Sequence, residues 1–198
     1  MPANLRKVTR DDLVPIAEYA AQRKARRAEL LPVKRLRRVA LGPWCTFYFE
    51  SFETLLFQIE EMLLVEKGGA EQLADELAAY NPLVPQGSEL VATVMFEIDD
   101  EVRRTAVLNQ LGGVEDHFFI QVGDERSPGV SEDDTERTRE DGKTSSVHFL
   151  HFVLTPDQAA RLRDPKATVM VGCDHPQYAH MALLSPATRA ELAKDLAI

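Results

Sequence analysis

The hydrophobic period of this chain changes near residue 90. Residues 52–67 form a long apolar run at helical spacing, whereas short apolar runs typical of strands follow at residues 118–122 and 147–154. Helical patterns come first, strand patterns follow and helices return at the end, without the regular alternation of a βαβ fold. We therefore expect an α+β domain with an antiparallel sheet of about five strands, helices packed on one face, and an Arg-rich N-terminal helix.

Start and stop signals set the expected bounds of the elements. The expected helices cover residues 10–30, 52–67, 70–79, 158–163 and 187–196. The expected strands cover residues 39–41, 45–49, 90–98, 102–108, 118–122, 147–154 and 168–171. Pro32 should end the first helix. Residues 123–146 are rich in Gly, Ser, Pro and charge, which predicts an exposed and mobile loop.

Charge divides the chain into two parts. The first 40 residues carry eleven Lys and Arg against four Asp and Glu, whereas the remaining 158 carry twelve against 28. This predicts a basic N-terminal helical arm over residues 1–40 and an acidic α+β body over residues 41–198, folded together as one unit. The arm should meet carboxylates of its own chain, of a second subunit or of a ligand. The acidic body argues against general nucleic-acid binding.

The sequence is typical of a cytoplasmic protein. Its N-terminus lacks the apolar core of a signal peptide, and no apolar stretch is long enough to span a membrane, so we expect no membrane partner. Cys45 and Cys173 stand alone, without a CxxC pair, which indicates a reducing compartment.

One polar cluster stands out among apolar residues. Glu50 follows an apolar strand, and Gln58 and Glu61 share one face of an otherwise apolar helix. Carboxylates in such surroundings need a cation, a metal or a hydrogen-bond donor. Arg23 and Arg26, on one stripe of the first helix, can supply that partner. Two interpretations stay open: ion pairs that dock the first helix onto the body, and a pocket that binds an anion or a metal.

His148 is a candidate for the same site. It alternates with His151 along one strand, so the two rings point to opposite faces and cannot both join one site. His148 either joins the Glu50 cluster or lies in the core as a hydrogen-bonded neutral histidine.

A second candidate site lies near the C-terminus. Cys173 and His175 alternate onto one side of an extended segment and His180 follows, a set that would suit zinc or iron if His148 or His151 added a further ligand. The alternative is a plain turn in which Asp174 bonds nearby backbone amides.

No complete catalytic signature is present. The chain contains no phosphate loop, no nucleophile elbow, no dinucleotide-binding glycine motif and no HExxH zinc motif. The sequence therefore identifies no enzyme class and no cofactor.

The chain resembles an uncharacterised bacterial family of about this length, a domain of unknown function. The resemblance covers nearly the whole chain and rests on residues 42–62, on Glu18, Tyr19 and Arg23, and on residues 147–152. Its most specific part is a Phe-Glu-Asn step followed by Gln-x-x-Glu-Met, matched here by Phe49, Glu50, Gln58, Glu61 and Met62. Ser51 replaces the Asn, a mild change because both residues cap helices well.

The resemblance implies a place among redox proteins, because members of the family are typically encoded beside rubrerythrin-like and heterodisulfide-reductase-like iron–sulfur proteins. Three functions stay open. The first is an accessory or binding protein of a redox or oxidative-stress system, which we expect to be a homodimer with an iron–sulfur or rubrerythrin-like partner. The second is a metalloprotein or enzyme built on Glu50, Glu61 and a histidine. The third is a binder of an anionic ligand through the Arg-rich arm.

Overall fold

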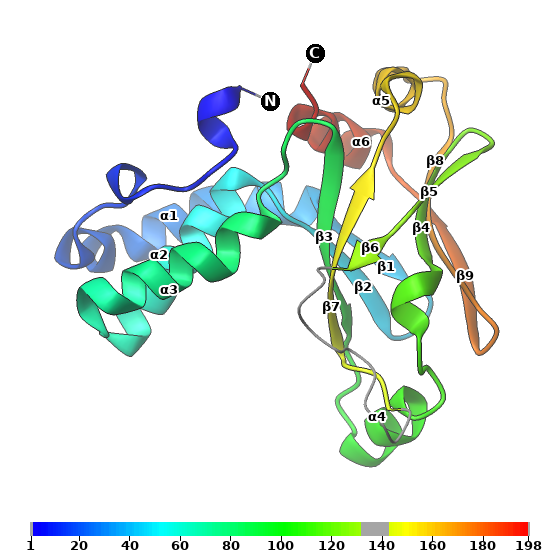
Figure 1. Ribbon diagram of the computed structural model, residues 1–198, viewed down its shortest axis with the longest axis horizontal. Helices are drawn as coiled ribbons and strands as arrows, with labels where there is room; N and C mark the ends of the chain where they lie inside the picture. The colour runs from blue at the N-terminus through cyan, green and yellow to red at the C-terminus, as the bar shows by residue number, and fades with distance from the viewer. Residues whose placement is uncertain (1, 132–142, 198) are drawn as a thin grey trace.

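The computed structural model describes residues 2–131 and 143–197 and arranges them as two antiparallel sheets with a group of helices to one side (Figure 1). The α-helices are α1 (Ile16–Leu36), α2 (Phe52–Glu66), α3 (Gly69–Tyr80), α4 (Glu101–Leu108), α5 (Pro156–Arg163) and α6 (Pro186–Leu192). Short 3-10 turns are η1 (Ala3–Leu5), η2 (Arg10–Asp12), η3 (Asn81–Leu83), η4 (Val114–His117) and η5 (Ala193–Asp195). The strands are β1 (Arg38–Leu41), β2 (Cys45–Phe49), β3 (Glu89–Phe96), β4 (Phe118–Val122), β5 (Glu125–Pro128), β6 (Val130–Ser131), β7 (Val147–Val153), β8 (Val169–His175) and β9 (Tyr178–Leu183).

The expected α+β class and the five-stranded antiparallel sheet are confirmed. That sheet has the strand order β1-β2-β3-β7-β6. A second sheet, with the order β5-β4-β8-β9, covers its other face and was not expected as a separate layer. The core between the sheets is rich in aromatic side chains. Phe47 of the first sheet meets Phe118 of the second edge to face, with 5.6 Å between ring centroids.

One glycine allows the chain to pass from one sheet to the other. β5 lies at an edge of the second sheet and β6 at an edge of the first, and Gly129 joins them. The Gly129 backbone N–H donates to the Phe118 carbonyl (2.8 Å). A Cβ at this position would lie only 3.0 Å from the Phe152 ring, so a larger residue would need that ring to move aside.

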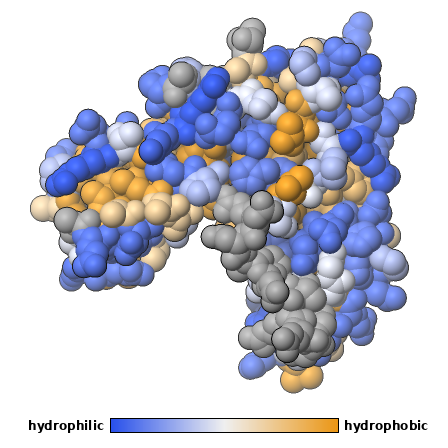
Figure 2. All heavy atoms as spheres, in the orientation of Figure 1, coloured by the Kyte–Doolittle hydropathy of each residue, from blue (hydrophilic) through white to orange (hydrophobic). Residues whose placement is uncertain are grey.

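The helices α1 to α3 lie against the outer face of the five-stranded sheet (Figure 1). α2 begins with a capping box in which Ser51 and Thr54 exchange hydrogen bonds, and its residues Leu55 and Ile59 pack in a cluster with Val91 of β3. α1 packs on α2 and contributes a single buried residue, Tyr19. Hydrophilic residues cover most of the face seen in Figure 2, which is hollowed where the helices meet the sheets.

Several expected bounds were wrong. Residues 102–108 form the helix α4 instead of a strand, because Asp100 caps it by accepting the Arg103 N–H (2.7 Å). Val102 is 80% exposed, so its β-branched side chain gains no packing against a sheet that would favour a strand. α1 begins at Ile16 and runs through Pro32 to Leu36. Arg37, directly after it, is buried and ion-paired, and this anchor outweighs the cost of a proline inside a helix.

The segment expected as one loop, residues 123–146, is partly regular. Its first residues form β5 and β6, because their backbone groups pair with β4 and β7. Residues 132–142 lie outside the described residues. Within the part of the chain that the structure describes, no helix is long and apolar enough to cross a membrane.

Candidate functional site

The arginine stripe of α1 pairs with carboxylates of α2, as the sequence predicts. Arg23 holds Glu61 through two hydrogen bonds of 2.8 and 2.7 Å, and Tyr19 donates its hydroxyl to the same carboxylate. Arg26 instead holds Glu60, at 2.6 Å. Glu60 is 3% exposed and was missed, although its place beside Glu61 on the helix was a usable signal.

These ion pairs change the titration of the groups they join. The hydrogen bond from Arg23 is the main reason why the pKa of Glu61 lies below its usual range. Burial, reinforced by the hydrogen bond to Glu61, raises the pKa of Tyr19 well above its usual value. The ionised carboxylate and the neutral phenol are therefore the stable forms of this contact.

Glu50 has a different environment. It directly follows the last residue of β2, and its backbone N–H donates to the Val91 carbonyl of β3 (2.8 Å). Thr93 of β3 and Thr54 of α2 each donate a hydroxyl to one of its carboxylate oxygens, both at 2.7 Å. Among the described residues, no Lys, Arg or His forms an ion pair with Glu50. Two neutral hydroxyls thus fix the orientation of a carboxylate that has no cation of its own.

The Glu50 cavity, defined as the space lined by Glu50 and Gln58 between the five-stranded sheet and the helices α1 and α2, has a volume of about 360 Å³. Most of its wall is apolar and comes from Leu55, Leu83, Met95, Val147 and Phe149. Gln58 is half-buried, and its side-chain amide has no hydrogen-bond partner among the described residues. Lys34 of α1 also lines this space. The cavity therefore offers one carboxylate and one free amide in a largely apolar wall, to which Lys34 and Arg37 also contribute.

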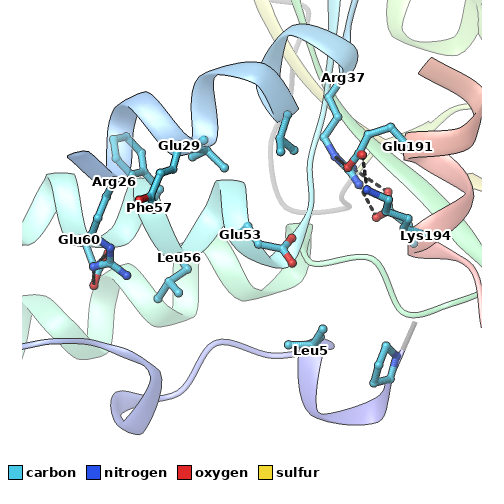
Figure 3. Close-up of a pocket in the computed structure, with 14 residues that line it drawn as sticks. Leu5, Arg26, Glu29, Arg37, Glu53, Leu56, Phe57, Glu60, Glu191 and Lys194 are labelled. Carbon is cyan, nitrogen blue, oxygen red and sulfur yellow. Dashed lines mark hydrogen bonds and ion pairs between the residues drawn. The ribbon is translucent and has the colours of Figure 1, made fainter. Parts of the chain in front are cut away.

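A second cavity, of about 500 Å³, lies between α1, α2, α6 and the N-terminal segment (Figure 3). The Arg26–Glu60 pair lies at one end, and Arg37 lies at the other. Arg37 binds both oxygens of Asp195 (2.8 and 2.7 Å) and also Glu191 (3.2 Å). Burial alone would lower the pKa of Arg37, but the hydrogen bonds and charge of Asp195 raise it. The ion pairs here join helices to one another and leave little for a ligand to bind.

Arg37 also separates the two cavities. It lines both of them and donates to the Glu50 backbone carbonyl (3.0 Å). Its side chain is 3% exposed, and its carboxylate partners hold it in place. No local sequence pattern predicts this role, because Glu191 and Asp195 lie more than 150 positions away along the chain.

The proposal that His148 joins the Glu50 cluster was wrong. His148 is fully buried on the opposite face of the sheet, beside the rings of Phe96 and Phe118. Its Nε2 lies 2.9 Å from the Ser145 carbonyl. Strand alternation sends Phe149 to the cavity and His148 to the core, so the core interpretation holds.

Cys173, His175 and His180 lie on the hairpin of β8 and β9. Cys173 pairs directly with His180 across the hairpin, while His175 Nδ1 accepts the Gln177 N–H (3.2 Å) at its turn. Within the described residues, no three His, Cys, Asp or Glu side chains are grouped to hold a metal ion. Burial raises the pKa of the Cys173 thiol to about 11. The turn interpretation was wrong for Asp174 as well: this residue lies in β8, and its carboxylate contacts the side chains of His117 (2.9 Å) and Arg126 (3.2 Å) instead of nearby backbone amides.

The comparisons with known proteins identify a family and a similar solved structure. No curated protein matches the sequence. A crystal structure of a novel protein of unknown function from Burkholderia pseudomallei K96243 is 39% identical in sequence, with a TM-score of 0.89. The match covers 96% of this chain and 100% of that one. Residues 7–196 match the model of a family described as protein of unknown function (DUF3501). The chain therefore belongs to the DUF3501 family, as its resemblance to an uncharacterised bacterial family led us to expect.

Proposed function

We propose that this protein is a binding protein whose ligand is a small molecule with an amino group, held at Glu50. The observation that carries the proposal is the Glu50 carboxylate, oriented by Thr54 and Thr93 and left without a cation among the described residues. A carboxylate has about four lone-pair sites, and the two threonines use two of them. The remaining sites can accept hydrogen bonds from an ammonium group.

The surroundings of Glu50 favour such a ligand. The apolar walls lower the local dielectric constant, so an ammonium group gains more from this carboxylate than it would at an open surface. The threonine hydroxyls hold the carboxylate in place before the ligand arrives, which reduces the entropy lost on binding. The free amide of Gln58 offers a further donor and acceptor in the same cavity.

Nuclear magnetic resonance with n-butylamine as the probe tests this proposal. Backbone and side-chain amide signals should shift and saturate around Gln58 and Thr93, with an affinity on the order of millimolar for so small a probe. Glu50→Gln keeps the shape of the side chain and removes its charge, so it should weaken binding roughly tenfold.

The matched control is Glu29→Gln. Glu29 lines the second cavity, is exposed and has no hydrogen-bond partner among the described residues, so its variant loses the same charge without touching the Glu50 cavity. It should bind n-butylamine like the parent. Equal weakening in both variants, or no saturable shift in the parent, would contradict the proposal.

The family resemblance supports a wider setting for this binding role. We propose that the protein is cytoplasmic and acts as a homodimeric accessory protein of a redox system with iron–sulfur and rubrerythrin-like proteins. Cys45 and Cys173 are buried free thiols whose pKa values are raised by burial, so both stay protonated at neutral pH. A redox role of this chain would therefore be that of a binding partner and not of a reactive thiol.

Complementation of a deletion strain under peroxide stress tests this setting. The parent gene should restore tolerance, and the Glu50→Gln variant should not if ligand binding serves that system. Size-exclusion chromatography with light scattering tests the homodimer separately. A deletion strain with unchanged oxidant tolerance would remove the redox setting and leave the amine-binding proposal standing.

A further inference from the structure

We infer that the ligand of Glu50 is a zwitterion, with its amino group at Glu50 and an anionic group, carboxylate or phosphate, at Lys34 and Arg35. This inference rests on the proposed function, since it names the class of molecule that the Glu50 cavity would take. The inference follows from the shape and the charge of the cavity that adjoins the Glu50 cavity.

A neighbouring cavity continues the space around Glu50. It has a volume of about 590 Å³ and lies between α1 and α2. Lys34, Tyr48 and Gln58 line both this space and the Glu50 cavity, so the two adjoin at these residues. A ligand anchored at Glu50 and longer than the Glu50 cavity would therefore reach past Gln58 into this neighbouring cavity.

The charge of the neighbouring cavity is opposite to that of Glu50. Lys34 and Arg35 both line it, and neither forms an ion pair with a described residue. Glu61, the carboxylate in the lining, is already held by Arg23. The ammonium group of Lys34 lies 5.8 Å from the centroid of the Phe57 ring, beside the path that the ligand would take.

The junction itself is suited to a chain of carbon atoms with polar ends. The Tyr48 hydroxyl donates to Glu97 (2.6 Å), and the Arg38 guanidinium lies 5.3 Å from the centroid of the Tyr48 ring. Tyr48 is therefore fixed and presents its ring to the junction, while its polar atom is already bonded. Gln58 is left as the group that can adjust its hydrogen bonds to the middle of a ligand.

The helix dipole is an alternative explanation for Lys34 and Arg35. Both residues lie in the last turn of α1, where a positive charge stabilises the helix. That effect needs no ligand and acts on the stability of the protein. A binding assay with matched probes separates it from the inference, since the helix dipole predicts no preference among ligands.

The experiment compares n-alkylamines with ω-amino carboxylates of matching chain length, each titrated into the parent protein by calorimetry. For the best length, the ω-amino carboxylate should bind about fivefold more tightly than its alkylamine, the gain typical of one partly exposed ion pair. An aminoalkyl phosphonate of the same length tests the doubly charged alternative.

Two variants assign the gain to Lys34. Lys34→Met keeps the apolar stem and removes the charge, so the ω-amino carboxylate should lose most of its advantage over the alkylamine. Because Lys34 also lines the Glu50 cavity, loss of its positive charge should leave alkylamine affinity equal to that of the parent or raise it. Lys24→Met is the matched control, because Lys24 lies on the same helix and lines neither cavity. It should keep the fivefold preference.

The outcomes separate this inference from the proposed function. If alkylamines bind and the carboxylate adds nothing, or if α,ω-diamines bind best, the zwitterion is wrong and the amine site stands. If α,ω-dicarboxylates bind and alkylamines do not, the proposed function itself is wrong and the inference falls with it.

Discussion

The two sheets and the helix α1 are held in the molecule by different forces. Between the sheets, Phe47 lies within 6.0 Å of three other phenylalanine rings, measured between centroids, and is fully buried. α1 buries a single residue, Tyr19, and is attached through ion pairs of Arg23 and Arg26. The first region depends on apolar area, whereas the second depends on charge.

This difference has consequences for stability and for function. Apolar burial is not screened by salt and does not titrate near neutral pH, while ion pairs at a surface weaken as salt rises or as carboxylates become protonated. α1 also supplies Lys34 to the Glu50 cavity. The wall of the candidate site is therefore attached more weakly than the sheet beneath it, and local opening of α1 would open the cavity.

The largest effect is expected in the aromatic core. Phe47→Ala should lower the free energy of unfolding by about 4 kcal/mol, because it removes a buried ring and leaves a cavity between the sheets. Urea denaturation followed by circular dichroism measures it. Val102→Ala, at a position 80% exposed, is the control and should change stability by less than about 0.5 kcal/mol. A loss at Phe47 no larger than at Val102 would contradict this description of the core.

The next effect tests the junction between the two regions. Arg37→Leu should cost about 3 kcal/mol, because it leaves the carboxylate of Asp195 buried without its cation, while Glu191 keeps its ion pair with Lys194. The double variant Arg37→Leu with Asp195→Leu should recover part of that loss, since it removes the stranded charge as well. Additive losses in the double variant, measured by the same denaturation, would show that Arg37 acts through its packing alone.

The sequence predicted those parts of the fold that depend on local pattern. The strands over residues 45–49, 118–122 and 147–154 and the helix starting at Phe52 were found by period and capping, since each signal lies within the element itself. The second sheet was missed because β9 alternates buried or half-buried residues with exposed ones, and the exposed side chains include the apolar Met181 and Leu183, so its pattern does not show a polar outer face. Its pairing with the neighbouring strand β8 of the same hairpin makes it a strand.

The candidate site was predicted in part for the same reason. Glu50 and Gln58 were identified as polar residues in apolar surroundings, and they do line one cavity. Thr93 could not be assigned, because nothing local connects a threonine in β3 with a carboxylate 43 residues earlier. His148 was left open between the Glu50 cluster and the core, since alternation gives two faces and does not say which one is the core; the structure places it in the core.

A smaller effect is expected where α1 meets α2. Tyr19→Phe should lower the free energy of unfolding by about 1 kcal/mol, because it removes the hydroxyl that donates to Glu61 and keeps the buried ring. Tyr80→Phe is the control, since the Tyr80 hydroxyl has no hydrogen-bond partner among the described residues. Hydrogen exchange should show lower protection of the backbone amides mainly in α1. An equal loss in the sheet amides would mean that α1 does not open separately.

The smallest effect concerns the pH dependence of the Arg23–Glu61 pair. The pKa of Glu61 is lowered in the folded protein, so the pair stabilises the fold above the ordinary glutamate pKa of about 4.3, and that contribution disappears as the pH falls through the lowered value. Arg23→Gln removes the pair, so its difference in stability from the parent should be present at neutral pH and vanish in acid.

Because Arg23 is 45% exposed, added sodium chloride should also reduce this difference in stability. The Phe47→Ala difference provides the internal standard, since it should stay constant under both treatments. If the Arg23→Gln difference is as constant as that of Phe47→Ala, then α1 is held by packing, and the contrast between the two regions is wrong.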